Sequence, residues 1–370
     1  MNTRLKELSR LFFKLGCTAF GGPAVHIAMM REEVVNKNAW ITDAHFLDLI
    51  SATNLIPGPN STEMTMHIGH ERAGWRGLIV AGMCFIFPAV VITSVLAYLY
   101  NQYGLLPEVA PYIYGIKPAI VGVIISAMVA LGRSAFKSIW LWILGLITFG
   151  VCMAGVNEIA ALFGAGALGM AKYMWQSQKQ RVNGILPVFL SHVISLPNVK
   201  IFLTFLKVGS ILYGSGYVLF AFLNDELVRT GLLTHTQLAD AIAVGQFTPG
   251  PVFSAATFIG WQMGGFWGAM AATIGIFLPS FIFVALLNPL IPKLRASKVI
   301  SSFLDAVNAS SIAIILFVCL DIFRDSIADW RSILILVISI SLTFIFKRLN
   351  TAFIVLSGAL LGYLYDAPQN

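Results

Sequence analysis

The chain has 370 residues, of which 58% are hydrophobic and 11% are charged, and its mean hydropathy is +0.82. Soluble globular domains carry about 25% charged residues, so the composition excludes a soluble protein and predicts a polytopic one that lies in the lipid bilayer. The net charge of +7 does not indicate nucleic-acid binding, because lysines and arginines gather in the cytoplasmic loops of membrane proteins and no basic motif is present.

The predicted helices of the first half begin with an amphipathic segment at about 11–30, followed by a charged connector. A polar segment that contains Pro57-Gly58-Pro59 comes next, at about 43–72, and its prolines predict a break in the helix. Four mainly apolar helices with few charges then follow at about 77–100, 112–132, 138–156 and 158–175. Several are shorter than the ~20 residues that span a bilayer, so we expect tilting or snorkelling at their ends.

The second half has the same order of segments. An apolar segment at about 201–222 and a polar, broken segment at about 235–264 precede four helices, at about 266–291, 302–320, 332–346 and 349–365. No alternation with a period of two is sustained in either half. The predicted fold is therefore all-α, a polytopic helical membrane protein.

Equivalent residues recur at an offset close to 193 along the chain. Phe13-Lys14-Leu15-Gly16 matches Leu206-Lys207-Val208-Gly209, and the first Pro-Gly-Pro matches Pro249-Gly250-Pro251. An ordered series of such matches over about 120 residues indicates an internal duplication. We therefore predict two homologous repeats, residues 1–180 and 201–370, joined by a linker at 181–200.

The charges of equivalent loops predict that the two repeats are inverted in the membrane. The loop Asn101–Pro111 has no lysine or arginine, whereas its counterpart Asn288–Lys298 has three. Positively charged loops stay in the cytoplasm, and inverted repeats are common in secondary transporters. The basic N-terminal segment, which this arrangement places outside, argues for the opposite orientation.

The two Pro-Gly-Pro motifs are the sharpest candidates for a substrate site. An amide side chain lies three residues before each motif, and hydroxyl side chains lie three and six residues after it. Proline suits the first turn of a new helix, whose free N–H groups and positive dipole end attract anions. The predicted substrate-binding residues are Asn54, Pro57, Gly58, Pro59, Thr62, Thr65, Gln246, Pro249, Gly250, Pro251, Ser254 and Thr257. The alternative is a kinked helix whose hydroxyls bond to their own backbone.

Lys14 and Lys207 form a second predicted element of the site, because a lysine inside an apolar segment is costly and often marks a transport pathway. Two such lysines from opposite repeats would compensate a doubly charged anion. Snorkelling of each lysine to the membrane surface is the alternative.

Other polar residues have simpler expected roles. We expect Glu63, which has Ala255 as its counterpart, to face water, with transport of a coupling proton as the alternative. The acidic pairs Glu32-Glu33 and Asp225-Glu226 are expected to form solvated salt bridges with neighbouring arginines. His67, His70 and Glu71 lack a further strong ligand, and no catalytic motif is present, so we expect no metal, no cofactor and no enzymatic activity.

The segment Phe20-Gly21-Gly22-Pro23-Ala24-Val25-His26 with Arg31, followed by the first Pro-Gly-Pro, resembles the chromate ion transporter (CHR) family in its long, two-repeat form. The resemblance implies a carrier in the inner membrane of a bacterium or archaeon, which exports chromate and gives chromate resistance; some members are linked to sulfate. It also implies a signature role for Gly21, Gly22 and Pro23. The second repeat has Tyr213-Gly214-Ser215-Gly216 there, so we expect the first repeat to contribute more.

Together these observations give the hypothesis of a secondary transporter, an antiporter for an oxyanion, with one anion site between the two Pro-Gly-Pro helix starts. Access would alternate as one repeat rocks against the other. A transporter of sulfate or another tetrahedral oxyanion, and an anion channel of the same fold, are the alternatives. A homodimer is left open.

Overall fold

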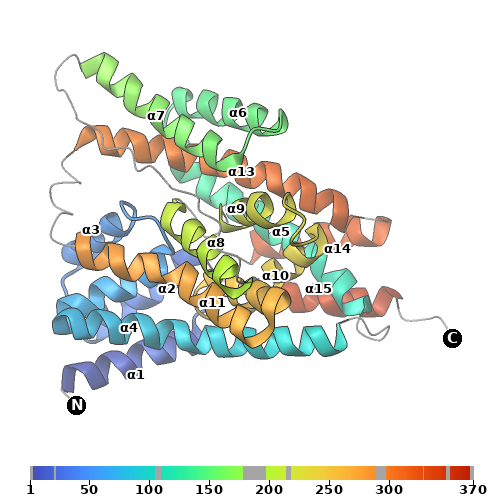
Figure 1. The fold of residues 1–370 in the computed structure, drawn as a ribbon, viewed down its shortest axis with the longest axis horizontal. Helices are drawn as coiled ribbons and strands as arrows, with labels where there is room; N and C mark the ends of the chain where they lie inside the picture. The colour runs from blue at the N-terminus through green and yellow to red at the C-terminus, as the bar shows by residue number, and fades with distance from the viewer. Residues whose placement is uncertain are drawn as a thin grey trace.

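The computed structural model describes residues 3–20, 22–104, 110–177, 197–213, 218–287, 297–327, 329–346 and 351–366. Within these ranges every regular element is a helix, so the predicted all-α fold is confirmed (Figure 1). Most of the predicted linker at 181–200 lies outside the described residues.

The first repeat contains α1 (Thr3–Thr18), α2 (Pro23–Arg31), a π-helical turn η1 (Glu32–Lys37), α3 (Asp43–Thr53), α4 (Asn60–Tyr103), α5 (Ala110–Ala135), α6 (Ile139–Met153) and α7 (Glu158–Ser177). The predicted first segment at 11–30 is two helices. A new helix starts at Pro23, whose fixed φ suits the first turn, and the extended Gly22 precedes it.

The second repeat contains α8 (Pro197–Ile211), α9 (Val218–Leu223), a π-helical turn η2 (Asn224–Val228), α10 (His235–Phe247), a 3-10 turn η3 (Val252–Ser254), α11 (Ala255–Leu287), α13 (Lys298–Ser326), α14 (Trp330–Ile345) and α15 (Thr351–Asp366). Each of these helices has a counterpart in the first repeat, and the π-helical turn after α9 corresponds to the one after α2. The duplication seen in the sequence is therefore present in the structure.

The helices α4 and α11 each contain a sharp break at equivalent positions. In α4 the backbone leaves helical geometry at Ala73 and Gly74, where φ is −148° and 62°. In α11 it does so at Gly264 and Gly265, where φ is −152° and 59°. The second residue of each pair has a positive φ, which glycine adopts without a steric penalty.

Each break folds its helix back into a hairpin. A Cβ atom added to Gly69 would lie 2.3 Å from the carbonyl oxygen of Gly77, and one added to Gly260 would lie 2.3 Å from that of Gly268. Residues this far apart in a straight helix would be about 12 Å apart at 1.5 Å per residue. Only glycines allow the two arms to touch at these positions. The breaks that the Pro-Gly-Pro motifs predict are separate ones, and they lie between α3 and α4 and between α10 and η3.

Four helices are long and apolar enough to cross a membrane: Asn60–Tyr103, Ala110–Arg133, Val252–Leu286 and Lys298–Arg324. Three shorter apolar helices accompany them, at Ile139–Met153, Trp330–Ile345 and Thr351–Tyr365. Exposed apolar side chains such as Ile139, Trp142 and Leu146 on α6 suit a lipid environment. The chain is therefore a multi-pass membrane protein.

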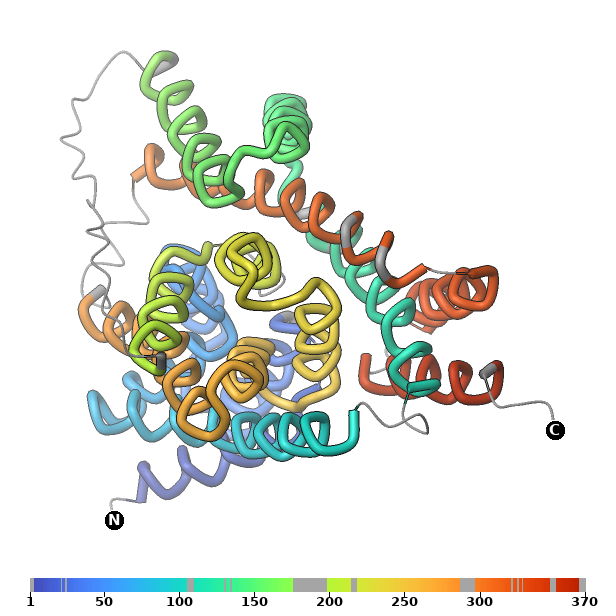
Figure 2. The backbone as a smooth tube through the Cα atoms, turned by 45° about the vertical axis from the view of Figure 1, so that its right-hand side comes forward, coloured from blue at the N-terminus to red at the C-terminus, as the bar shows by residue number. Residues whose placement is uncertain are grey.

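The helices form two bundles, and each bundle contains helices of both repeats (Figure 2). The hairpin bundle consists of α1 to α4 and α8 to α11, with α4 packed against α1 and α11 against α8. The flanking bundle consists of α5 to α7 and α13 to α15, drawn in green and red tones. In it, α5 packs against α14 and α15, while α13 packs against α6 and α7.

The flanking bundle interlocks the repeats at equivalent glycine contacts. A Cβ atom on Gly115 of α5 would lie 2.0 Å from the carbonyl oxygen of Gly358 in α15. At the corresponding crossing, a Cβ atom on Gly169 of α7 would lie 2.5 Å from the Cβ of Ala306 in α13. Close backbone approach at small residues is typical of helix packing in membranes. The two repeats are thus entwined rather than side by side.

Candidate functional site

The two Pro-Gly-Pro motifs are tied to the opposite repeat by a reciprocal pair of hydrogen bonds. The Gly58 N–H donates to the carbonyl oxygen of Leu212, and the Gly250 N–H donates to that of Ala19, each at 2.8 Å. Leu212 follows α8 and Ala19 follows α1, so the acceptors occupy equivalent positions. Such reciprocity is what a pseudo-twofold axis between the repeats produces.

Only glycine fits at the central position of each motif. Gly58 has a φ of +138° and Gly250 a φ of +88°, a region that side chains disfavour. A Cβ atom on Gly58 would lie 2.3 Å from Ser280 Oγ, and one on Gly250 would lie 3.0 Å from the Cβ of Ala89. All six residues of the two motifs are buried. The N–H groups of the two glycines connect the repeats in this conformation, because each already donates to a backbone carbonyl of the other repeat.

Two hydroxyls beside the motifs stand out because they are buried without a partner. Thr62 Oγ1 and Ser254 Oγ have no hydrogen-bond partner in the described part of the chain, and both side chains are 0% exposed. They occupy equivalent places, three residues after each motif. Buried hydroxyls normally find a partner, so a pair of unsatisfied ones indicates a place for a ligand or water.

The two threonines further along are already bonded. Thr65 Oγ1 donates to the carbonyl oxygen of Thr62 at 2.6 Å, as the kinked-helix alternative expected. Thr257 Oγ1 lies 2.8 Å from Thr273 Oγ1 in the other arm of its hairpin. These two residues therefore support the hairpins in this conformation.

The paired amides differ between the repeats. Asn54 is exposed, and its Oδ1 accepts a hydrogen bond from Asn60 Nδ2 at 2.9 Å, whereas Gln246 is only 2% exposed. In the signature segment, Gly22 and Pro23 form the start of α2, and Gly21 lies outside the described residues. Ser215 and its neighbours at 214–217 also lie outside them.

Each of the two predicted lysines is paired with an acid of its own repeat. Lys14 Nζ lies 3.1 Å from Glu33 Oε1, and Lys207 forms the equivalent ion pair with Glu226. Burial raises the pKa of Glu33, but the hydrogen bonds from Lys14 and Lys37 outweigh it and leave the pKa below its usual value. Both lysine side chains are about half exposed, and their charge is compensated locally.

Glu63 does not face water, which corrects the expectation from the sequence. Its side chain is 0% exposed, and Oε1 accepts a hydrogen bond from Ser280 Oγ at 3.2 Å. The sequence carried no signal for this, because the residue that covers Glu63 lies more than 200 positions away and belongs to the other repeat.

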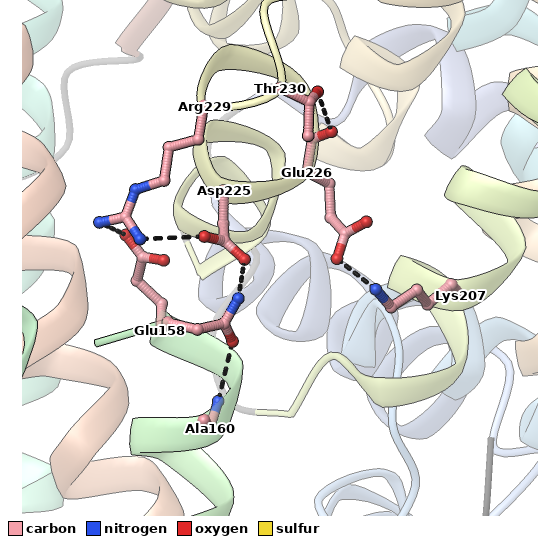
Figure 3. A network of polar contacts seen from close by, with 8 residues as sticks. Glu158, Ala160, Lys207, Asp225, Glu226, Arg229 and Thr230 are labelled. Carbon is pink, nitrogen blue, oxygen red and sulfur yellow. Dashed lines mark hydrogen bonds and ion pairs between the residues drawn. The ribbon is translucent and has the colours of Figure 1, made fainter. Parts of the chain in front are cut away.

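The second connector, whose polar contacts are drawn in Figure 3, is also less exposed than expected. Asp225 is only 9% exposed, and its carboxylate lies 3.1 Å from Arg229. Arg229 also lies 3.2 Å from Glu158, which is 0% exposed at the start of α7. Asn157 completes the cluster by donating to Asp225. The network joins the repeats, whereas Arg31 in the first connector pairs with the exposed Asp43 at 2.6 Å.

The described residues contain no group of three or more histidine, cysteine or acidic side chains that could hold a metal ion. His67 is buried with 1% exposure, and Glu71 lies 3.5 Å from His45 at the surface. The strongest feature of the site is therefore the pair of hydroxyls at the two equivalent hairpins.

Two entwined helical repeats with paired broken helices define a multi-pass membrane protein of the transporter class. The profile of the family described as chromate transporter matches residues 6–170 and 199–363. The chain belongs to the chromate transporter family, as the signature residues indicated. The two matched regions coincide with the two repeats.

Full-length relatives come from bacteria and archaea. A probable chromate transport protein of Synechococcus elongatus is 28% identical over 98% of this chain and 95% of its own length. A chromate transport protein of Cupriavidus metallidurans is 28% identical over 97% of this chain and 92% of its own. An uncharacterized transporter of Methanocaldococcus jannaschii is 27% identical over 95% of this chain and 92% of its own length. No solved structure matches the chain.

Proposed function

We propose that the protein moves chromate, or a tetrahedral oxyanion of the same charge and shape, across the cytoplasmic membrane of a bacterium or archaeon. Family membership supports transport, and the names of the full-length bacterial relatives support chromate as the substrate. Export would give chromate resistance. Sulfate is the competing substrate, because it is also a tetrahedral dianion. The relatives are named as transport proteins, which also supports a protein without enzymatic activity.

The proposed anion site lies at the starts of the two hairpin helices. The observation that carries it is the pair of unsatisfied buried hydroxyls, Thr62 Oγ1 and Ser254 Oγ. Each is in the first turn after its Pro-Gly-Pro motif, where the positive end of a helix dipole favours an anion. Neutral donors bind a dianion without holding it so tightly that release becomes slow. Lys14 and Lys207 would contribute positive charge to the anion only where their ion pairs with Glu33 and Glu226 open.

Alternating access would use the two bundles rather than the two repeats as its moving parts. Each bundle contains helices of both repeats, so rocking one repeat against the other would separate closely packed glycine contacts such as Gly115 with Gly358. Movement of the flanking bundle relative to the hairpin bundle leaves these contacts intact. Packed bodies that slide or rotate as units are the usual form of such transitions.

The test is uptake of labelled chromate into proteoliposomes that contain the purified protein, with sulfate, molybdate and phosphate as competitors. We expect saturable uptake that chromate on the opposite side accelerates, which an anion channel would not show. Thr62→Ala and Ser254→Ala should each weaken the apparent affinity, by about tenfold if one hydrogen bond to a charged group is lost. Thr343→Ala is the matched control, because that hydroxyl donates to its own helix at Ser339. If no oxyanion moves or competes, the proposal fails.

A further inference from the structure

The pseudo-twofold axis relates two buried pairs of residues whose chemistry differs. Glu63 follows the first Pro-Gly-Pro, and Ser280 follows Pro279 of α11; the equivalent residues are Ala255 and Ala89. Glu63 and Ser280 touch across the two repeats, and Ser280 lies over Gly58 as Ala89 lies over Gly250. One of the two equivalent places is therefore polar and the other is apolar.

Among the described residues, the carboxyl group of Glu63 has one hydrogen-bond partner and no ion-pair partner. Oε1 accepts from Ser280 Oγ, while Oε2 is buried and has no hydrogen-bond partner in the described part of the chain. Gly58 leaves the space that the carboxyl group fills, because a Cβ atom there would come within 2.4 Å of Oε1. An ionised carboxylate without a cation is strongly disfavoured in such surroundings.

The described neighbours of Glu63 include one hydroxyl, one phenol and one imidazole. From α11 it meets Ser280, and from the segment after α8 Tyr213 lies within electrostatic reach. On its own helix, the buried His67 lies one turn further along. None of the ion pairs in the described ranges involves Glu63. In this conformation the carboxyl group is therefore best accommodated as the neutral acid, with its proton on the unsatisfied Oε2.

We propose that Glu63 is a proton-binding site whose occupancy controls binding of the oxyanion. This inference rests on the proposed function, because Glu63 directly follows Thr62 in the first turn of α4. The ionised carboxylate and the oxyanion compete for the same positive helix end and repel each other. The neutral acid removes that repulsion and adds a donor. Water on one side of the membrane supplies the proton to Oε2. Water on the other side takes the proton up after the flanking bundle has moved relative to the hairpin bundle.

The asymmetry of the two repeats sets the stoichiometry of this coupling. Ala255 and Ala89 leave the equivalent place without a titratable group, so one proton accompanies each dianion. The loaded carrier then moves one net negative charge in place of two. Proton and oxyanion travel in the same direction.

The test measures apparent affinity against pH in proteoliposomes, with sulfate and chromate as probes. Sulfate stays a dianion from mildly acidic to mildly alkaline pH and is used over that whole range. Chromate takes up a proton near neutral pH, so it is used only at alkaline pH, where it is a dianion. For the wild type we expect affinity to fall by about tenfold per pH unit once Glu63 ionises. Glu63→Gln should keep the acidic-pH affinity at every pH and should carry no protons with the anion, as an entrapped pH dye reports. Glu71→Gln, an exposed acid on the same hairpin arm, is the control.

A second variant keeps the carboxyl group and changes only its partner. Ser280→Ala removes the hydroxyl that donates to Oε1 and stabilises the ionised form, so the affinity transition should move to higher pH. Ala89→Ser adds a hydroxyl at the equivalent place and should leave the transition unchanged. Retention of the wild-type pH dependence by a folded, transporting Glu63→Gln would overturn the inference while leaving the proposed function in place. Failure of the wild type to move any oxyanion would overturn the proposed function instead.

Discussion

Tyr100, near the end of α4, donates its hydroxyl to Asp240 Oδ2 of α10, with 2.5 Å between the two oxygens. Asp240 is only 4% exposed, and Lys117 Nζ of α5 lies 4.0 Å from its other oxygen. The cluster therefore brings together both repeats and both bundles. It is a polar contact at the boundary where the two bundles would move against each other.

Removing the Tyr100 hydroxyl should destabilise the protein. Tyr100→Phe leaves one oxygen of the buried Asp240 without its donor, at a cost of about 1–3 kcal/mol in the free energy of unfolding. Thermal unfolding in detergent measures the loss. Tyr103→Phe is the control because Tyr103 is 52% exposed, three residues further along α4. Equal thermal stability of the two variants would contradict the role assigned to the Tyr100 hydrogen bond.

Substitution of the motif glycines should be more severe. Gly58→Ala combines a strained φ of +138° with a Cβ atom 2.3 Å from Ser280 Oγ. The strained backbone alone costs about 1–3 kcal/mol, and the clash adds to it. We expect a lower yield of monodisperse protein and a lower unfolding temperature. Gly150→Ala on α6, where an added Cβ meets no atom within 4 Å, should behave like the wild type.

Breaking the ion pairs between α7 and η2 should cost more stability than breaking an exposed ion pair. Arg229→Ala leaves the buried Glu158 and Asp225 facing each other without their cation. We expect a loss of about 3 kcal/mol, the lower end of the range for removing one partner of a buried pair, because Arg229 keeps 34% exposure. Arg31→Ala breaks the surface pair with Asp43 and should have a much smaller effect on thermal unfolding. The reverse order would show that the network in Figure 3 does not hold the repeats together.

The predicted inversion of the repeats can be tested by labelling. In a variant without the four native cysteines, Gln102→Cys should react with a membrane-impermeant thiol reagent added to intact cells. Lys298→Cys, at the equivalent loop of the second repeat, should react only after the cells are opened. Both side chains are exposed at helix ends. Labelling of both positions from the same side would mean that the repeats are parallel.

The sequence predicted the helices and the duplication well because those features depend on local signals. Uncharged stretches, the Pro-Gly-Pro breaks and recurring glycines such as Gly69 and Gly260 lie in the chain itself. The burial of Glu63 was predicted wrongly, because its environment is made by Ser280 of the other repeat. Asp225 was likewise expected in a solvated connector, and it is buried by contacts with α7. What the sequence could not supply is which residues of one repeat cover those of the other.

The two prolines of each motif were expected to free backbone N–H groups for a ligand. That expectation concerns the first N–H groups of the helix after each motif, whereas the glycine N–H groups ahead of it bind the carbonyl oxygens of Leu212 and Ala19. These acceptors exist only because the ends of α1 and α8 cross to the opposite motif. A duplication signal predicts that the same contact occurs twice, but it does not say between which partners.

The entwined flanking bundle has a consequence for how the protein is made. The helices packed most extensively against α5 are α13, α14 and α15, and α13 is also the main partner of α6 and α7. Because synthesis proceeds from the N-terminus, α5 to α7 enter the membrane before any of these partners has been translated. They must wait there as separate apolar helices until about the last fifth of the chain, from Lys298 on, has been made. Assembly of the flanking bundle is therefore a late step of biogenesis, and a ribosome that stops before α13 leaves half of the bundle without its binding surface.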